Sequence, residues 1–83
     1  MITAEFYFAG PFTGKNDDEI ISKLKSGSVF TMWESNKQYM AGLRERLIGS
    51  NGLDDGDITL GTSKAFLDDL ESLGIAKLSR KDQ

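Results

Sequence analysis

The sequence predicts a single small α/β domain over residues 1–83, with a four-stranded sheet and three helices. Two observations lead to this prediction. Short apolar stretches with strand-like composition alternate with stretches of helical periodicity, and capping residues and glycines separate them. This alternation favours helices packed on the faces of a sheet. Because the last two expected strands are short and partly polar, an α+β fold with antiparallel edge strands is the alternative.

The first strand and the first helix are expected before residue 26. Residues 2–8 alternate between apolar and polar side chains and then become continuously apolar, which is typical of a strand. Gly10 and Pro11 then predict a loop that lasts to Asn16. Asn16 is followed by three acids, so we expect it to cap a helix that ends near Lys25.

The middle of the chain predicts a second strand and the longest helix. Residues 29–33 have the composition of a buried strand. The end of this segment can instead already be helical, because Thr31 with Glu34 has the spacing of a capping box, as does the less conventional Ser35 with Gln38. Helical periodicity extends over residues 35–48. Gly49 is expected to close this helix.

The last third predicts two short strands around a third helix. Residues 58–60 are expected to form the third strand, after a loop rich in Gly, Asn and Asp. Thr62 or Ser63 caps the helix that follows. Residues 75–78 have the pattern of the fourth strand, and we expect residues 79–83 to fray.

Composition limits the chemistry that the chain can perform. Cysteine and histidine are both absent. This excludes disulfides, thiolate nucleophiles, Cys or His zinc sites and Ser-His-Asp catalysis. We expect no metal and no cofactor. The sequence also lacks a signal peptide and an apolar run of the ~20 residues that span a bilayer, so a cytoplasmic protein without membrane contact is expected.

The net charge of −3 is distributed unevenly. Residues 1–49 are neutral, whereas residues 54–71 hold six acids and a single lysine. No stripe of Lys and Arg is present, so direct nucleic-acid binding is not expected. The acidic stretch predicts contact with the basic surface of a protein partner. We expect Trp33 or Phe12 to serve as an aromatic anchor beside the acids. The acids of this predicted surface are Asp54, Asp55, Asp57, Asp68, Asp69 and Glu71.

A second interpretation starts from residues 6–14, Phe-Tyr-Phe-Ala-Gly-Pro-Phe-Thr-Gly. They resemble the opening strand and Ala-Gly-Pro loop of the nucleoside 2-deoxyribosyltransferase-like family. The resemblance implies a nucleoside-binding or nucleotide-binding enzyme that transfers an N-glycosyl group. Asp69 would stand in place of the family's catalytic glutamate, which is longer by one methylene. The ligand would lie near Gly10, Pro11, Gly14 and Lys15.

The leading hypothesis is a small acidic, non-enzymatic protein-binding domain that occupies the surface of a partner. Small acidic chains without Cys or His resemble accessory or inhibitor proteins of phages and other mobile elements. Dimerisation is compatible with this size, because a small domain gains apolar burial by association. A third interpretation, a winged helix over residues 58–78, conflicts with DNA contact because its helix would present acids to phosphates.

Overall fold

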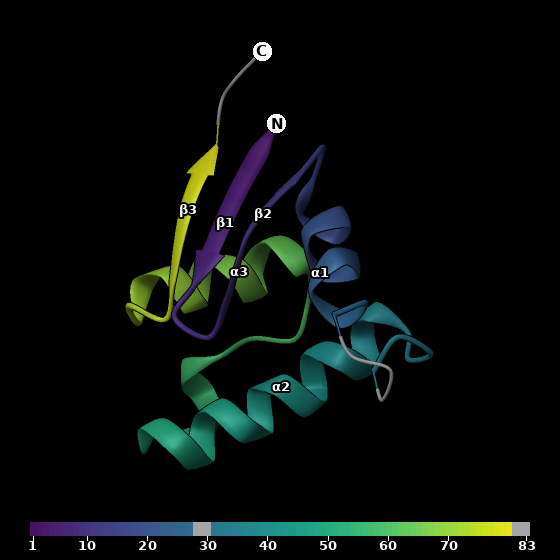
Figure 1. Cartoon of the computed structure of the whole chain (residues 1–83). Coiled ribbons are helices and arrows are strands. Elements are labelled where there is room, and N and C mark those ends of the chain that lie inside the picture. Colours follow the sequence, from purple (N-terminus) through teal and green to yellow (C-terminus); the bar gives the residue numbers. More distant parts are fainter. Residues whose placement is uncertain (28–30, 81–83) are drawn as a thin grey trace.

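A computed structural model describes residues 1–27 and 31–80 (Figure 1). It confirms one sheet with three α-helices. The elements follow the order β1 (Ile2–Phe6), β2 (Ala9–Gly14), α1 (Asp17–Lys25), α2 (Asn36–Asn51), the short 3-10 helix η1 (Asp55–Asp57), α3 (Ser63–Ser72) and β3 (Ala76–Arg80).

The sheet has three strands within the described residues, and the prediction of four is wrong. Their order is β2-β1-β3, and both pairs are antiparallel, as in the α+β alternative. Residues 58–60 form no strand. Their backbone bonds to side chains instead: Ile58 O accepts from Arg44 Nε at 2.9 Å, and Thr59 N donates to Asp69 Oδ2 at 2.7 Å.

The expected strand at 29–33 is described only in part. Thr31 to Trp33 form turns, with Glu34 N donating to Thr31 O at 3.0 Å. Val29 and Phe30 lie outside the described residues.

The loop predicted from Gly10 to Asn16 is wrong, because most of it is strand β2. The chain turns at Tyr7 and Phe8 and returns antiparallel to β1. Gly10 has a φ of 105°, and a Cβ there would lie 3.2 Å from the carbonyl oxygen of Ala4. A left-handed backbone this close to its neighbour favours glycine. Gly10 is therefore explained by the backbone geometry of the hairpin.

The three helix starts are confirmed, and each has the predicted cap. Asn16 accepts from Glu19 N at 2.9 Å, and Thr62 accepts from Ala65 N at 3.0 Å. Ser35 and Gln38 bond reciprocally: Ser35 Oγ accepts from Gln38 N at 3.1 Å, and Gln38 Oε1 accepts from Ser35 N at 2.9 Å. These caps use donors that a helix leaves free at its first turn.

Helices α1 and α3 cover one face of the sheet, and α2 packs against α1 (Figure 1). The core lies between the sheet and these helices, and its largest fully buried side chains are Phe66, Ile20, Ile21, Leu67 and Leu70. Alternate residues of each strand point to the other face. That face is polar and carries Thr3, Glu5, Thr13, Lys77 and Ser79.

Arg80 joins the end of β3 to two helices. Its Nη1 lies 3.0 and 2.8 Å from the two carboxylate oxygens of Asp17 in α1, and its Nη2 lies 2.7 Å from Asp68 Oδ1 in α3. The side chain of Asp17 is 15% exposed, so these ion pairs are partly shielded from water. The prediction that residues 79–83 fray is therefore wrong for Ser79 and Arg80, whereas residues 81–83 lie outside the described part.

We expect Arg80→Gln to lower the free energy of unfolding by about 1–3 kcal/mol, because the largely buried carboxylate of Asp17 then loses the partner of its hydrogen bond. Urea unfolding followed by circular dichroism measures the change. Lys77→Gln removes an exposed cation from the same strand and should cost less than about 0.5 kcal/mol. Equal costs for the two variants would contradict a structural role for Arg80.

Candidate functional site

The tip of the β1–β2 hairpin exposes two aromatic side chains. Tyr7 is 64% exposed and Phe8 is 40% exposed. Their rings meet edge to face with centroids 5.2 Å apart, and Phe8 also stacks on the buried Phe6 at 5.4 Å. The pair is therefore tied to the core while much of its surface faces solvent. Exposed aromatics held in this way are typical anchors of protein interfaces.

The aromatic tip, meaning Tyr7 and Phe8, borders several hollows, and Tyr7 lines two of them. On one side Tyr7 N donates to Ile75 O at 3.1 Å, and a hollow of about 320 Å³ there is bordered by Glu5 and Lys77. On the other side a hollow of about 240 Å³ separates the tip from α2. Its lining on α2 consists of Tyr39, Leu43, Arg46, Leu47 and Ser50.

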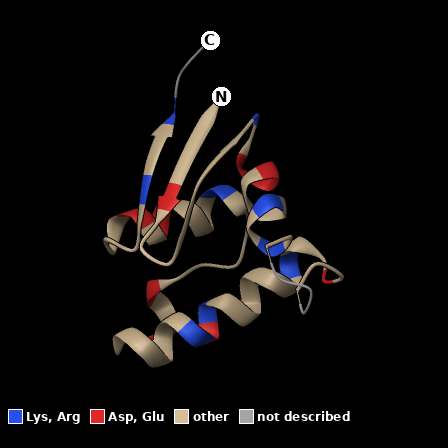
Figure 2. Ribbon diagram, viewed as in Figure 1, with Lys and Arg blue, Asp and Glu red and all other residues tan. Residues whose placement is uncertain are grey.

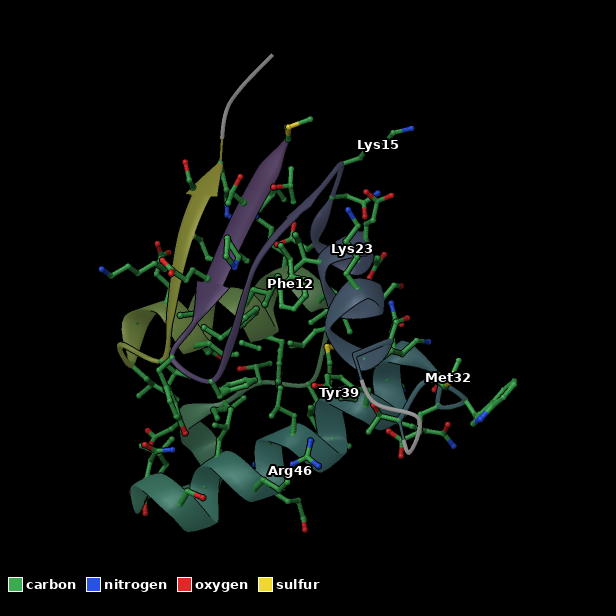
Figure 3. All side chains as sticks on the ribbon, viewed as in Figure 1. Phe12, Lys15, Lys23, Met32, Tyr39 and Arg46 are labelled. Carbon is green, nitrogen blue, oxygen red and sulfur yellow. The ribbon has the colours of Figure 1, made fainter. Side chains whose placement is uncertain are left out.

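The hollow on the α2 side has an apolar floor, and Tyr39, Arg46 and Ser50 add polar groups to its lining. Leu43 and Leu47 are buried, and Tyr39 is only 6% exposed. Burial raises the pKa of Tyr39, although the positive charge of Arg46 acts in the opposite direction. Tyr39 therefore stays a neutral hydroxyl at physiological pH. Figure 3 shows Tyr39 and Arg46 on the same helix, below the hairpin.

Three acids of the predicted acidic surface have partners inside the fold. Asp57 Oδ2 accepts from Asp54 N at 2.9 Å, and Asp69 Oδ2 accepts from Thr59 N at 2.7 Å. Asp68 lies 2.8 Å from Lys64 and 2.7 Å from Arg80. These carboxylates shape loops and join elements, so they are less available to a partner than a solvated acid would be.

The remaining acids of that surface are placed differently. Asp54 and Glu71 are exposed, and the side chain of Asp55 is not described. Figure 2 shows acidic residues on η1, near the end of α3 and on β1. On β1, Glu5 adds an exposed carboxylate that the sequence interpretation omitted.

The two predicted aromatic anchors have different surroundings. Trp33 is 83% exposed and Met32 beside it is 42% exposed, in the turn that precedes α2. Phe12 is half-buried against the core, with its ring centroid 6.3 Å from that of Phe6. Of the two, only Trp33 is placed to reach a partner without rearrangement.

The residues expected to lie near a nucleoside or nucleotide, Gly10, Pro11, Gly14 and Lys15, belong to strand β2 and to the turn that follows it. Gly10 and Pro11 belong to β2, and a Cβ at Gly14 would lie 3.1 Å from Glu19. The backbone N–H of Lys15 donates to Glu19 Oε1 at 3.0 Å, while its side chain points away from the fold (Figure 3). A carboxylate of the chain thus already accepts from the backbone just before the start of α1.

The sequence interpretation missed Tyr7 and Phe8 because it assigned them to the first strand. A short apolar run does not by itself distinguish a buried strand from an exposed turn, because the same residue types occur in both. The signal that was available is Gly10, whose position just after the aromatics suits a tight return of the chain.

Comparisons with known proteins give no relative. No protein-family model matches the chain, and neither the curated proteins nor the solved structures contain a significant match. Over residues 1–27 and 31–80, no group of three or more acidic side chains is arranged to hold a metal ion. None of the helices in this described part is long and apolar enough to cross a membrane.

We expect Asp69→Ala to lower the free energy of unfolding by about 1–2 kcal/mol, because the N–H of Thr59 loses its acceptor. Glu71→Ala, an exposed change in the same helix, should be nearly neutral. Thermal or urea unfolding distinguishes the two variants. A neutral Asp69→Ala would show that this carboxylate is a solvated surface acid.

The hydrogen bond from Lys64, followed by the charge of Arg80, holds the pKa of Asp68 below its usual range although desolvation opposes this. The associated stability is therefore present above the unfolded pKa of about 3.9 and is lost as the pH falls through the folded pKa. Carboxyl NMR titration should detect the lowered pKa. In Lys64→Met the pKa should rise, and an unchanged value would contradict the assigned cause.

Proposed function

We propose that the chain is a small acidic, non-enzymatic protein-binding domain in the cytoplasm, of the accessory or inhibitor type found in phages and mobile elements. It acts by occupying a surface of a partner protein. The observation that supports this proposal best is the aromatic tip: Tyr7 and Phe8 are exposed, yet the stacking of Phe8 on Phe6 fixes their position. A fixed aromatic anchor binds with little loss of side-chain entropy.

The hollows beside the tip favour a protein surface over a small ligand. Their volumes of about 320 and 240 Å³ lie at or below the lower end of the range for small-molecule pockets, roughly 300–1,000 Å³. Each can receive a side chain from a partner. The neutral hydroxyl of Tyr39 and the guanidinium of Arg46 offer hydrogen bonds at the border of one of them.

Two exposed acids near the tip are the basis for proposing a partner with a basic surface. Glu5 borders the first hollow, and the exposed Glu71 lies three residues before Gly74 on its rim. Lys77 and Arg46 are interspersed with these acids, and the whole chain has a net charge of −3. Acids in this position increase the association rate with a basic surface and fix orientation, whereas the aromatic tip supplies affinity.

We expect the double variant Tyr7→Ser/Phe8→Ser to lose its partner. Affinity capture from the source cells with mass spectrometry identifies proteins retained by the native chain, and a purified hit is then titrated by calorimetry. Loss of an aromatic anchor costs at least about 2 kcal/mol, or roughly 30-fold in Kd. Trp33→Ser is the matched control, since it removes an exposed aromatic elsewhere and should retain the partner.

Two outcomes of this experiment would count against the proposal. If the native chain and the tip variant retain the same proteins equally, the tip is not the contact. If Trp33→Ser alone loses the partner, the contact lies at the turn before α2.

Charge reversal tests the basic character of the partner. We expect Glu71→Lys to weaken binding and to reduce its dependence on salt, because an attractive charge becomes repulsive. Glu45→Lys makes the same change of charge on α2 at an exposed position that lines neither hollow, and it should have a smaller effect. Equal effects of the two variants would indicate that binding depends on the net charge of the chain and not on an acid near the tip.

A further inference from the structure

The outer edge of β3 presents unpaired backbone groups. In an antiparallel pair, residues alternate between bonding to the neighbour and pointing away from it. Tyr7 N bonds to Ile75 O, so Glu5 with Lys77 and Thr3 with Ser79 are the bonded pairs of β1 and β3. The N–H and C=O groups of Ala76, Leu78 and Arg80 therefore point outward. Within the described part of the chain, these groups have no hydrogen-bond partner.

The other edge of the sheet is blocked. Pro11 lies at an outward-pointing position of β2 and has no N–H to offer. The outward carbonyl of Thr13 already accepts from Lys23 Nζ, and α1 packs against β2 (Figure 1). Natural sheets protect their edges against pairing with such devices. Of the two edges of the sheet in residues 1–27 and 31–80, the β3 edge is therefore the one suited to accept another strand.

The sequence of β3 is complementary to itself. If two copies pair antiparallel about Leu78, then Leu78 faces Leu78, Lys77 faces Ser79 and Ala76 faces Arg80. No two like charges lie directly opposite, and each of the two long charged side chains, Lys77 and Arg80, has a small one across from it. In this pairing the Leu78 side chain of the second copy packs against the half-buried Leu78 of the first. The two Lys77 side chains are diagonal neighbours, and each already has Glu5 opposite on β1.

We propose that the chain forms a two-fold symmetric homodimer through its β3 edges. The two sheets join into one of six strands, in the order β2-β1-β3-β3-β1-β2. The outward groups of Ala76, Leu78 and Arg80 supply six backbone hydrogen bonds. A symmetric, self-complementary contact of this kind closes at two copies and does not propagate, because the β2 edges that remain outermost are blocked.

Analytical ultracentrifugation tests the dimer. The weight-average mass should rise from the 9.2 kDa of one chain towards twice that value as the concentration approaches about 1 mM, the range of a weak edge contact. Leu78→Pro deletes one outward N–H and leaves the bonds to β1 in place, so it should stay monomeric. Leu78→Ala keeps the N–H and should dimerise more strongly than Leu78→Pro. A native mass that stays at 9.2 kDa would overturn the proposal.

Cross-linking fixes the register. Residues paired across such a ladder have Cα atoms about 5.5 Å apart, within the range of a disulfide. The chain has no cysteine, so Leu78→Cys should give a clean disulfide-linked dimer under mild oxidation. Ser79→Cys, which lies diagonal to its own copy, should cross-link more slowly. Equal rates would contradict pairing about Leu78. Tyr7→Ser/Phe8→Ser should dimerise normally, which separates this proposal from that of partner binding.

Discussion

The whole structure depends on covering one face of a three-stranded sheet. Ile2, Ala4 and Phe6 of β1 all point to the same side and are buried there by helices. A chain of 83 residues has too little apolar surface to cover the second face as well. That face is therefore polar, and both sheet edges lie near solvent. The positions available for contact with other molecules follow from this one-sided packing.

The acidic residues show how a small core uses charge for its own architecture. Arg80 extends from the last strand to Asp17 and Asp68 on two helices. Asp69 holds the segment that precedes α3 through the N–H of Thr59. In a domain with few apolar contacts, such bonds define the positions of loops that packing alone leaves free. Some acids of the stretch therefore hold the fold together, and only the others are available to a partner.

The hairpin produces the most distinctive surface feature. Its turn occurs within an apolar run, so two aromatic side chains are carried out of the core. The stacking of Phe8 on Phe6 keeps one of them in contact with the interior. The same hairpin forms β2, whose outer edge is closed by Pro11 and by Lys23. The surfaces that remain open to other molecules are therefore the aromatic tip and the outer edge of β3.

The sequence by itself determined the features that depend on neighbours along the chain. Asn16, Ser35 with Gln38, and Thr62 start helices, and each cap bonds within three residues. Spacing therefore located these helix starts to within a few residues, although it left Thr31 with Glu34 and Ser63 as alternative caps. The apolar faces of the helices were equally predictable, since helical periodicity is local. The presence of one sheet and three helices follows from the alternation of these local signals.

Only the tertiary structure decided the features that join distant residues. The pairing of β3 with β1, the loss of the strand at 58–60 and the role of Asp69 each depend on partners at least ten residues away. The turn at Tyr7 is close in sequence, and Gly10 is compatible with it, but its position also depends on the pairing of β2 with β1 and on the packing of β2 on α1. Long-range pairing and burial are collective, and the residues involved do not signal them individually.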